Sequence, residues 1–281
     1  MKETKVIVCS NEKTFLKSLK DADTVFVWHF KQEWLKLAPK LNLIVTPAAG
    51  REFIQIDLPA GIKIEHSCFH GRLIGETVLG MILANSRGIL ASYQFQNTKA
   101  WPRQELDKQM RLLQGSQVTI LGFGNLGSQV GRLAKPFGPH ICGIKRAAAA
   151  SPDYFDKDDL ILPLKELDSV LPQTDHLVLC LPASEETTNI INESRLKLLP
   201  SHASIYNVGR GNSIDENSLI TALSSNNLRA AYLDVFKEEP LPITSPLRTC
   251  PNCFIMPHAS VFCPNFMDYF IDEFLIKHVK S

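Results

Sequence analysis

One glycine-rich turn constrains the fold of this chain more than any other feature. Residues 118–121 form a short apolar, β-branched run typical of a buried parallel strand, and they lead directly into Gly122-x-Gly124-x-x-Gly127. The residues that follow can begin a helix, and residues 140–144 supply a second strand about where one is expected. The sequence therefore predicts the strand, glycine turn and helix of a dinucleotide-binding βαβ unit.

Each glycine of this turn has a separate physical task. Gly122 permits the tight turn, Gly124 lets the backbone approach a pyrophosphate, and Gly127 lets the helix pack closely on the strand. The N–H groups and the positive dipole end of the helix, which residues 128–133 can begin, then hold the phosphates, and Asn125 and Leu126 of the turn are expected to contact the cofactor as well. We therefore expect all five residues to bind the cofactor.

The composition excludes several classes of protein. The chain has 281 residues, 44% of them hydrophobic, which is enough for one large or two ordinary domains. Its formal net charge of +1 gives no reason to expect nucleic acid or an anionic membrane as partner. The start does not resemble a signal peptide, and no apolar stretch approaches the roughly 20 residues that cross a bilayer. Seven scattered cysteines, an odd number, indicate reduced thiols, so we expect a soluble, cytoplasmic protein.

Strands and helices alternate on both sides of a long helical pattern that runs from residue 75 to about residue 96. Before it, strands are expected at 5–9, 24–28, 43–46 and 62–65, and helices at 12–19 and 31–41. After the glycine unit, strands are expected at 176–181, 203–208, 230–233 and 253–256, and helices at 193–199, 215–223 and about 265–279. The alternation predicts two α/β domains, the second doubly wound. We assign residues 1–79 and 262–281 to a substrate domain and residues 80–261 to a dinucleotide-binding domain.

Polar residues follow three of the predicted strands at the points where these strands end. The strand at 203–208 leads into Gly209-Arg210-Gly211, the next leads to Asp234, and the last leads to His258. In open α/β sheets, ligands bind at the carboxyl ends of the strands. Arg210, Asp234 and His258 should therefore converge on one cleft, with Glu239 on the loop after Asp234.

These motifs resemble the signatures of the D-isomer-specific 2-hydroxyacid dehydrogenases. The resemblance is carried by Asn207-Val-Gly-Arg210-Gly, by Leu233-Asp234-Val-Phe with Glu239-Pro240-Leu, by Pro257-His258, and by their order and spacing after the glycine turn. It covers most of the chain between residues 76 and 258. It implies a Rossmann domain with a smaller flavodoxin-like substrate domain, and hydride transfer between NAD(P)H and a small 2-oxo or 2-hydroxy acid, as in glyoxylate and hydroxypyruvate reductases. It also implies a homodimer formed through the region of the long helix.

The resemblance also implies a role for each polar residue. Arg210 would hold the substrate carboxylate and polarise its 2-oxo group, a planar, bidentate task that suits a guanidinium. His258 would donate a proton to the oxygen, and Glu239 would favour the imidazolium form and fix its ring. Asp234 would orient the nicotinamide carboxamide. Pro182, Val208 and Gly209 are further expected cofactor contacts.

A second group of candidates concerns the substrate. The backbone of Ala49 and Gly50 resembles the family's loop that receives the substrate carboxylate. Arg51 follows, where much of the family has an apolar residue, and it offers recognition of a second anionic group. His66, His70 and Arg72 offer the same. Charged residues on a solvated loop remain the alternative for all four side chains.

The choice of nucleotide depends on the end of the second strand, about 20 residues past the glycine turn. An acid at this place accepts hydrogen bonds from the ribose 2′-hydroxyl of NAD. Here the strand ends in Lys145 and Arg146, which offer charge-assisted hydrogen bonds to a 2′-phosphate. The sequence therefore predicts NADP as the preferred cofactor, with NAD as the alternative.

Two other functions compete with this interpretation. Cys250-x-x-Cys253-x4-His258-x4-Cys263 copies a zinc-knuckle spacing, but a buried strand occupies the place of the flexible loop, so no metal is expected. A nicotinamide-binding regulatory or interaction protein on the same fold is the second alternative. The presence of Arg210, Glu239 and His258 together favours an enzyme.

Overall fold

The computed structural model describes residues 5–50, 53–96, 98–147 and 149–278, and the chain divides into two compact units. The first unit consists of Met1–Phe69 and Pro264–Ser281, and the second is His70–Cys263. The boundary expected from the sequence, between residues 79 and 80, falls inside helix α2 (His70–Ser86), whereas the units divide before this helix. The functional assignment of the two domains stays a prediction.

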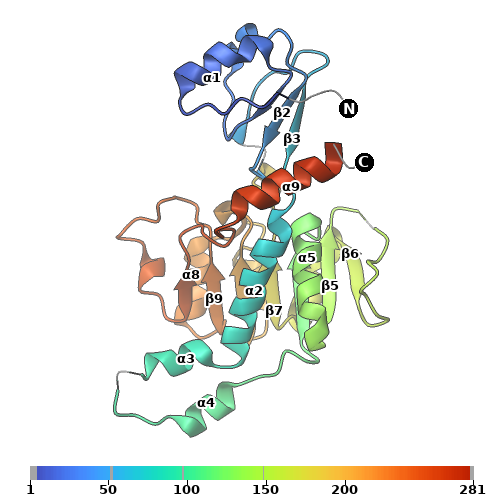
Figure 1. Cartoon of the computed structure of the whole chain (residues 1–281). Coiled ribbons are helices and arrows are strands. Elements are labelled where there is room, and N and C mark those ends of the chain that lie inside the picture. Colours follow the sequence, from blue (N-terminus) through green and yellow to red (C-terminus); the bar gives the residue numbers. More distant parts are fainter. Residues whose placement is uncertain (1–4, 51–52, 97, 148, 279–281) are drawn as a thin grey trace. The chain divides into compact units, whose positions relative to one another are not determined.

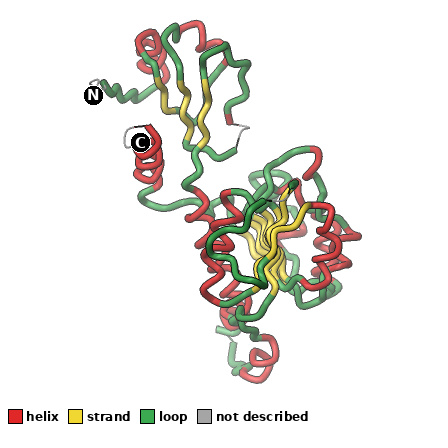
Figure 2. Tube along the Cα trace, turned by 90° about the vertical axis from the view of Figure 1, so that its right-hand side faces the viewer, coloured by secondary structure: helices red, strands yellow, loops and turns green. Residues whose placement is uncertain are grey.

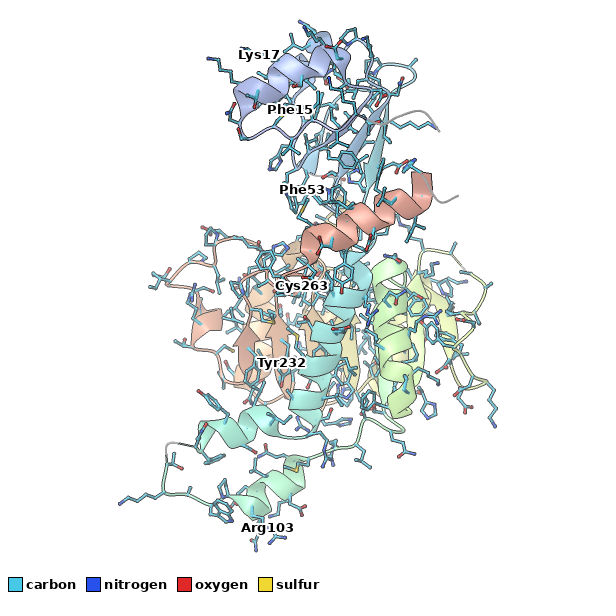
Figure 3. The ribbon with its side chains drawn as sticks, in the orientation of Figure 1. Phe15, Lys17, Phe53, Arg103, Tyr232 and Cys263 are labelled. Atoms are coloured by element: carbon cyan, nitrogen blue, oxygen red, sulfur yellow. The ribbon has the colours of Figure 1, made fainter. Side chains whose placement is uncertain are left out.

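The first unit is built on a parallel sheet with the strand order β1-β2-β3, of which Figure 1 labels β2 and β3. Its elements are α1 (Glu12–Ser18), η1 (Leu19–Asp21), β1 (Thr24–Phe26), η2 (Gln32–Leu37), β2 (Leu43–Thr46), β3 (Lys63–His66) and α9 (Phe266–His278). Asn11 begins α1, because its side-chain oxygen accepts the N–H of Thr14 at 2.9 Å. Phe15, labelled in Figure 3, packs edge-on against Trp34 in the core of this unit, with ring centroids 5.4 Å apart.

The prediction of a strand at residues 5–9 is wrong. These residues lie in no strand, and the side chains of Val6 and Val8 are 78% and 92% exposed. Their β-branched composition favours a strand, but a strand is stable only when a neighbour completes its hydrogen-bond ladder. Strand β1 pairs with β2, and no described strand pairs with residues 5–9.

The second unit contains seven parallel strands in the order β10-β9-β8-β7-β4-β5-β6. They are β4 (Gln117–Leu121), β5 (His140–Lys145), β6 (Leu160–Pro163), β7 (His176–Leu179), β8 (Ser204–Asn207), β9 (Ala230–Leu233) and β10 (Cys253–Ile255). The chain builds outward from β4 through β5 to β6, then crosses back to place β7 on the other side of β4. The topological switch point therefore lies between β4 and β7, and the expected doubly wound α/β fold is confirmed.

Strand β6 was not expected from the sequence. Its apolar run is only three residues long and ends in Pro163, which lacks an N–H donor. A proline is tolerated here because β6 is the edge strand of the sheet.

Helices cover both faces of this sheet, as Figure 2 shows. On one face, α2 and α5 (Asn125–Ala134) bury Val78, Ile82 and Val130 against Val118 and Ile120 of β4. The other face is covered by α6 (Leu167–Val170), α7 (Glu193–Leu198) and α8 (Glu216–Ser224), whose leucines form a second core. The short 3₁₀ helices are η4 (Lys135–Phe137), η5 (Leu164–Glu166), η6 (Leu171–Gln173), η7 (Glu185–Thr187), η8 (Gly211–Ser213) and η9 (Pro246–Arg248).

The long helix expected at residues 75–96 is broken in the structure. It begins earlier, as α2, and ends at Ser86, after which α3 (Ile89–Gln94) and α4 (Arg103–Gln109) follow. Gly88 causes the break, because its φ of +64° is left-handed and cannot continue a right-handed helix. None of the helices in the described ranges has the length and apolar character that a bilayer crossing requires.

Candidate active site

The glycine turn connects β4 to α5 at the switch point. The N–H groups of Gly122 and Phe123 both donate to Ile144 O at 3.0 Å, which ties the turn to β5. Gly122 has a φ of +97°, and a Cβ there would lie 2.6 Å from Cys180 O. Only glycine fits this position, because both the backbone conformation and the space exclude a side chain.

Gly124 occupies a different environment. A Cβ on Gly124 would meet no protein atom within 4 Å, so the packing of the protein does not demand a glycine here. Gly124 is also the N-cap of α5, and no side chain caps this helix. The turn therefore leaves space and uncapped helix-end geometry of the kind that receives a pyrophosphate.

A cavity of about 450 Å³ opens beside this turn at the carboxyl ends of β4, β5 and β7. It is the right size for part of a nucleotide, since ligand pockets typically measure ~300–1,000 Å³. Seven of the expected cofactor residues line it: Gly122, Gly124, Asn125, Leu126, Lys145, Arg146 and Pro182. The cavity therefore satisfies the Rossmann rule that ligands bind at the switch point.

Two cations stand at the β5 end of this cavity. Lys145 is the last residue of β5, and Arg146 follows it directly. The guanidinium Nη1 of Arg146 lies 3.9 Å from Glu186 Oε2, and both side chains are mostly exposed. An exposed pair at this distance is weak, so Arg146 can exchange Glu186 for a phosphate at little cost. No acid occupies the end of β5.

Four expected cofactor residues do not line the cavity. Gly127 lies in α5, where a Cβ would come 2.5 Å from Gly122 O, so this glycine allows the helix to lie close to the turn. Gly209 lets the chain after β8 approach the chain after β7, because a Cβ would lie 2.6 Å from Leu181 N. Val208 is buried, as is Asp234. The contacts of Val208, Gly209 and Asp234 with the nicotinamide half of the cofactor stay predictions.

Several lining residues were missed by the sequence analysis. They are Leu121, Phe123, Ile144, Ala147, Leu164, Cys180, Leu181, Glu186, Thr187 and Ile190. One local signal was present, since Ser184 and Thr187 form a capping box that starts η7 at the cavity wall. The apolar members carry no such signal, because their sequence pattern is also that of ordinary core residues.

Arg210 lies on a turn that the side chain of Asn207 holds in place with two hydrogen bonds. Asn207 Oδ1 accepts the N–H of Gly209 at 3.2 Å, and its Nδ2 donates to Arg210 O at 3.1 Å. The guanidinium Nη1 of Arg210 donates to Gly209 O at 2.7 Å. At Gly211, an added Cβ would overlap the carbonyl carbon of Phe236, so the turns after β8 and β9 touch directly. The structure thus fixes the Arg210 turn against the loop that carries Glu239.

Asp234 holds the segment that carries His258 in place through hydrogen bonds. Its carboxylate is buried, with 1% of the residue exposed, and accepts the N–H groups of Ala259 at 2.7 Å and Ser260 at 3.2 Å. The Ser260 hydroxyl also donates to it, and the N–H of His258 donates to Asp234 O at 2.9 Å. These bonds hold His258 with a φ of +52°, which is uncommon for a residue other than glycine.

His258 and Glu239 form a hydrogen-bonded pair. Nδ1 of His258 lies 2.7 Å from Glu239 Oε2, while Glu239 Oε1 accepts the N–H of Phe236 at 2.9 Å. The carboxylate is therefore held from both sides, and it fixes the imidazole ring. Nδ1 is engaged by Glu239, and the side chain of His258 is partly exposed.

The expected substrate loop follows β2 in the first unit. Ala48 donates its N–H to Thr46 Oγ1 at 3.2 Å, while Ala49 is exposed and Gly50 is half-buried. Arg51 lies outside the described residues. His66 ends β3, and His70 is buried at the start of α2. Arg72 pairs with Glu76 along α2 at 3.3 Å, as solvated helix charges do.

The zinc-knuckle spacing does not form a ligand cluster in the structure. Cys253 begins β10, the side chain of His258 is paired with Glu239, and no disulfide joins cysteines in the described part of the chain. Among the described residues, no group of three or more histidine, cysteine or acidic side chains could hold a metal ion.

The fold and this set of residues define a nicotinamide nucleotide-dependent oxidoreductase, and comparison with known families gives the same class. The family described as D-isomer specific 2-hydroxyacid dehydrogenase, NAD binding domain, matches residues 79–260. The chain belongs to this family. The resemblance inferred from the motifs and the assignment to an NAD(P)-dependent enzyme are confirmed, and the alternative of a regulatory protein is not supported.

Individual relatives agree with this assignment. The chain is 30% identical to a glyoxylate reductase of Aeropyrum pernix, over 88% of this chain and 76% of the relative. It is 29% identical to glyoxylate/hydroxypyruvate reductase B of Yersinia pestis, over 81% of this chain and 70% of the relative. A solved D-isomer specific 2-hydroxyacid dehydrogenase of Xanthobacter autotrophicus Py2, in complex with NADPH and MES, has a TM-score of 0.77 at 26% identity and covers 93% of this chain and 81% of its own.

Proposed function

We propose that this enzyme reduces small 2-oxo acids of the glyoxylate and hydroxypyruvate type, with NADPH as the preferred reductant. The observation that carries the proposal is the pair formed by His258 Nδ1 and Glu239 Oε2 at 2.7 Å, at the same edge of the sheet as Arg210. The names of the two similar reductases support this substrate class.

The residues of the large cavity fit a nicotinamide dinucleotide, which supplies the hydride when it is bound. The space at Gly124 and the N-terminal turn of α5, with Asn125 and Leu126, would hold the pyrophosphate. Lys145 and Arg146 would hold the 2′-phosphate. Residues 182, 208 and 209, together with Asp234, follow β7, β8 and β9 and would flank the nicotinamide.

Arg210 would bind the substrate carboxylate with its guanidinium and draw electron density from the 2-oxo oxygen. Asn207 already fixes the turn that carries Arg210, so the loss of backbone conformational entropy on substrate binding would be small. In the first unit, the N–H groups of Ala49 and Gly50 are proposed as donors to a substrate carboxylate. Arg51 would read a second anionic group where a substrate carries one.

His258 would donate the proton from Nε2 to the 2-oxo oxygen as the hydride arrives at C2, which gives the 2-hydroxy acid. Glu239 accepts from Nδ1 and stabilises the imidazolium that this step needs. In the reverse direction, Nε2 accepts the hydroxyl proton. Hydroxypyruvate and other prochiral substrates would give the D-isomer.

The enzyme is further proposed to be a cytoplasmic homodimer that associates through the segment after α2. This segment exposes large apolar side chains, with Ile89 57%, Tyr93 70% and Trp101 90% exposed. Apolar side chains of this size on α3 and just before α4 are typical of an interface. The lack of disulfides among the described cysteines agrees with a reducing compartment.

The test is a steady-state assay of the purified chain on a panel of 2-oxo acids with NADPH and with NADH. We expect reduction of glyoxylate or hydroxypyruvate, and chiral analysis of the hydroxypyruvate product should give the D-isomer. Arg210→Lys should raise KM and lower kcat together, because an ammonium cannot hold the carboxylate in two-point contact. Failure to reduce any 2-oxo acid with either nucleotide would contradict the proposal.

A further inference from the structure

A second, smaller cavity lies in the nucleotide-binding unit, at the amino-terminal edge of the seven-stranded sheet. Its volume is about 50 Å³. The lining residues that carry the argument are Ser86, Arg111, Asp175, His176, His202 and Arg229. They come from the end of α2, from the chain before β4, and from the amino ends of β7, β8 and β9. The cavity is therefore separate from the cofactor cavity, which is lined by the opposite ends of the strands.

The cavity carries an excess of positive charge. Arg111 and Arg229 both line it, and neither forms an ion pair with an acid in the described part of the chain. Burial lowers the pKa of Arg229, and the nearby charge of Arg111 lowers it further, so the two guanidinium groups repel each other. Two neighbouring cations of this kind favour an anion between them.

The one carboxylate among the lining residues is already engaged. Asp175 Oδ1 lies 2.8 Å from His202 Nε2, and Oδ2 accepts the N–H of Gln117 at 2.7 Å. His176 adds no charge at neutral pH, because burial lowers its pKa to about 4, and its Nδ1 lies 3.0 Å from Tyr206 Oη. Each carboxylate oxygen of Asp175 thus already has a partner other than the two arginines.

A buried hydroxyl in the same cavity lacks a partner. Ser86 is 1% exposed, and no described protein group forms a hydrogen bond with its Oγ. Buried hydroxyl groups are almost always hydrogen-bonded, either to protein or to something bound. Ser86 and the two arginines line one cavity, so an acceptor bound there would lie among these three donors.

We propose that this cavity binds a small inorganic oxyanion of the phosphate or sulfate class, held by Arg111, Arg229 and the hydroxyl of Ser86. The size of the cavity admits a ligand of few atoms and excludes a nucleotide. The guanidinium fork matches the oxygen spacing of such anions. Bound there, the anion would join the end of α2 to the sheet, a connection that already includes Arg229 Nη2 donating to Asn85 O at 3.3 Å and Arg111 N donating to Ser86 O at 2.8 Å.

The experiment measures thermal unfolding of the full chain against phosphate concentration, with NADP⁺ at saturation so that phosphate does not compete for the cofactor site. Sulfate and chloride series are run at matched ionic strength. We expect a saturable rise in unfolding temperature of about 2–4 °C with phosphate or sulfate, and no saturable rise with chloride. Equal responses to all three salts would show general screening and overturn the proposal.

Three variants assign the response to this cavity. Arg111→Gln, whose side chain is exposed, should raise the half-saturating phosphate concentration about tenfold. Ser86→Ala should raise it about threefold while leaving the unfolding temperature without phosphate unchanged or higher, since it removes an unpartnered hydroxyl. Arg103→Gln, on α4 in Figure 3 and not among the lining residues, is the matched control and should respond as wild type. A response that persists unchanged in both cavity variants places the anion elsewhere and refutes the site.

Discussion

Nδ1 of His258 lies 2.7 Å from Oε2 of Glu239, and the backbone N–H of His258 donates to the backbone oxygen of Asp234 at 2.9 Å. The ring is therefore held by the Glu239 carboxylate, and the main chain of His258 is held by the backbone carbonyl of Asp234. If His258 is the proton donor as proposed, a ring held in this way would lose little entropy when substrate binds.

The first prediction concerns this pair. His258→Ala removes the proton donor and should lower kcat on the order of a hundredfold or more, with the KM for NADPH little changed. Glu239→Gln keeps the size of the side chain but not its charge, so it should lower kcat less than His258→Ala does. Normal turnover by His258→Ala would show that another group donates the proton.

The second prediction concerns Asp234 as a positioning residue. Asp234→Asn keeps the shape of the side chain but replaces a carboxylate oxygen with an NH2 group. An amide is a weaker acceptor than a carboxylate, so the hydrogen bonds from the N–H groups of Ala259 and Ser260 should weaken. We expect a loss of about 1–3 kcal/mol in unfolding free energy and a fall in kcat through misplacement of His258. A merely structural acid would lower stability alone. Steady-state kinetics below the unfolding temperature, compared with urea unfolding, separates the two effects.

The third prediction concerns pH and the buried His176. Burial lowers its pKa from the ordinary value of 6.5 to about 4 in the folded state. Between these values the unfolded chain binds the proton and the folded chain does not, so stability is full above pH 6.5 and falls as the pH drops toward 4. The loss should approach ~3 kcal/mol.

The measurement is the urea midpoint as a function of pH for wild type and for His176→Gln. The variant should start less stable, since the bond to Tyr206 is altered, but it should show a shallower fall between pH 6.5 and 4. Identical slopes for both proteins would mean that His176 does not contribute to the acid sensitivity.

The fourth prediction separates two glycines of the turn. Gly124→Ala places a Cβ where no protein atom lies within 4 Å, so thermal stability should hardly change. The same Cβ points into the proposed pyrophosphate site, and the dissociation constant for NADPH should rise about tenfold or more. Gly127→Ala is the contrast, because its Cβ would lie 2.5 Å from Gly122 O and should lower stability itself. Nucleotide affinity unchanged in Gly124→Ala would place the pyrophosphate elsewhere.

The strands and their polar ends were predictable because they depend on local sequence. The runs that form β4, β8 and β9 were identified from short apolar patterns, and register then aligns Asn207 with Leu233, which brings Arg210 and Asp234 to one edge. Interactions over long sequence separations were not predictable. The hydrogen bonds that Ala259 and Ser260 donate to the Asp234 carboxylate join residues about 25 positions apart, and no local sequence pattern predicts them.

The errors have equally specific causes. The apolar run at residues 5–9 has strand composition, but pairing decides whether a strand forms, and pairing is a tertiary property. The break at Gly88 was missed because a single glycine inside a helical pattern is often tolerated. Glu186 was missed because a charged residue on a loop looks the same whether it faces solvent or a cavity.

The last prediction is the preference for NADPH over NADH. Lys145 ends β5 and Arg146 follows it, both line the cofactor cavity, and no acid stands at this strand end to bind the ribose 2′-hydroxyl. Each charge-assisted bond to a 2′-phosphate contributes about 1.5–3 kcal/mol, enough for a preference of tenfold or more. Glu186 Oε2 lies 3.9 Å from Arg146 Nη1, and its negative charge would repel a 2′-phosphate bound to Arg146. Glu186→Gln should therefore strengthen the preference for NADPH.

The measurement is the ratio of kcat/KM with NADPH to kcat/KM with NADH. The double variant Lys145→Asp with Arg146→Ala should reverse the ratio, because the new carboxylate accepts from the ribose 2′-hydroxyl and repels a 2′-phosphate. Arg132→Gln is the control, since Arg132 pairs with Asp153 and does not line the cavity, and its ratio should match wild type. A wild type that prefers NADH, or a double variant whose ratio does not move, would show that this strand end does not select the nucleotide.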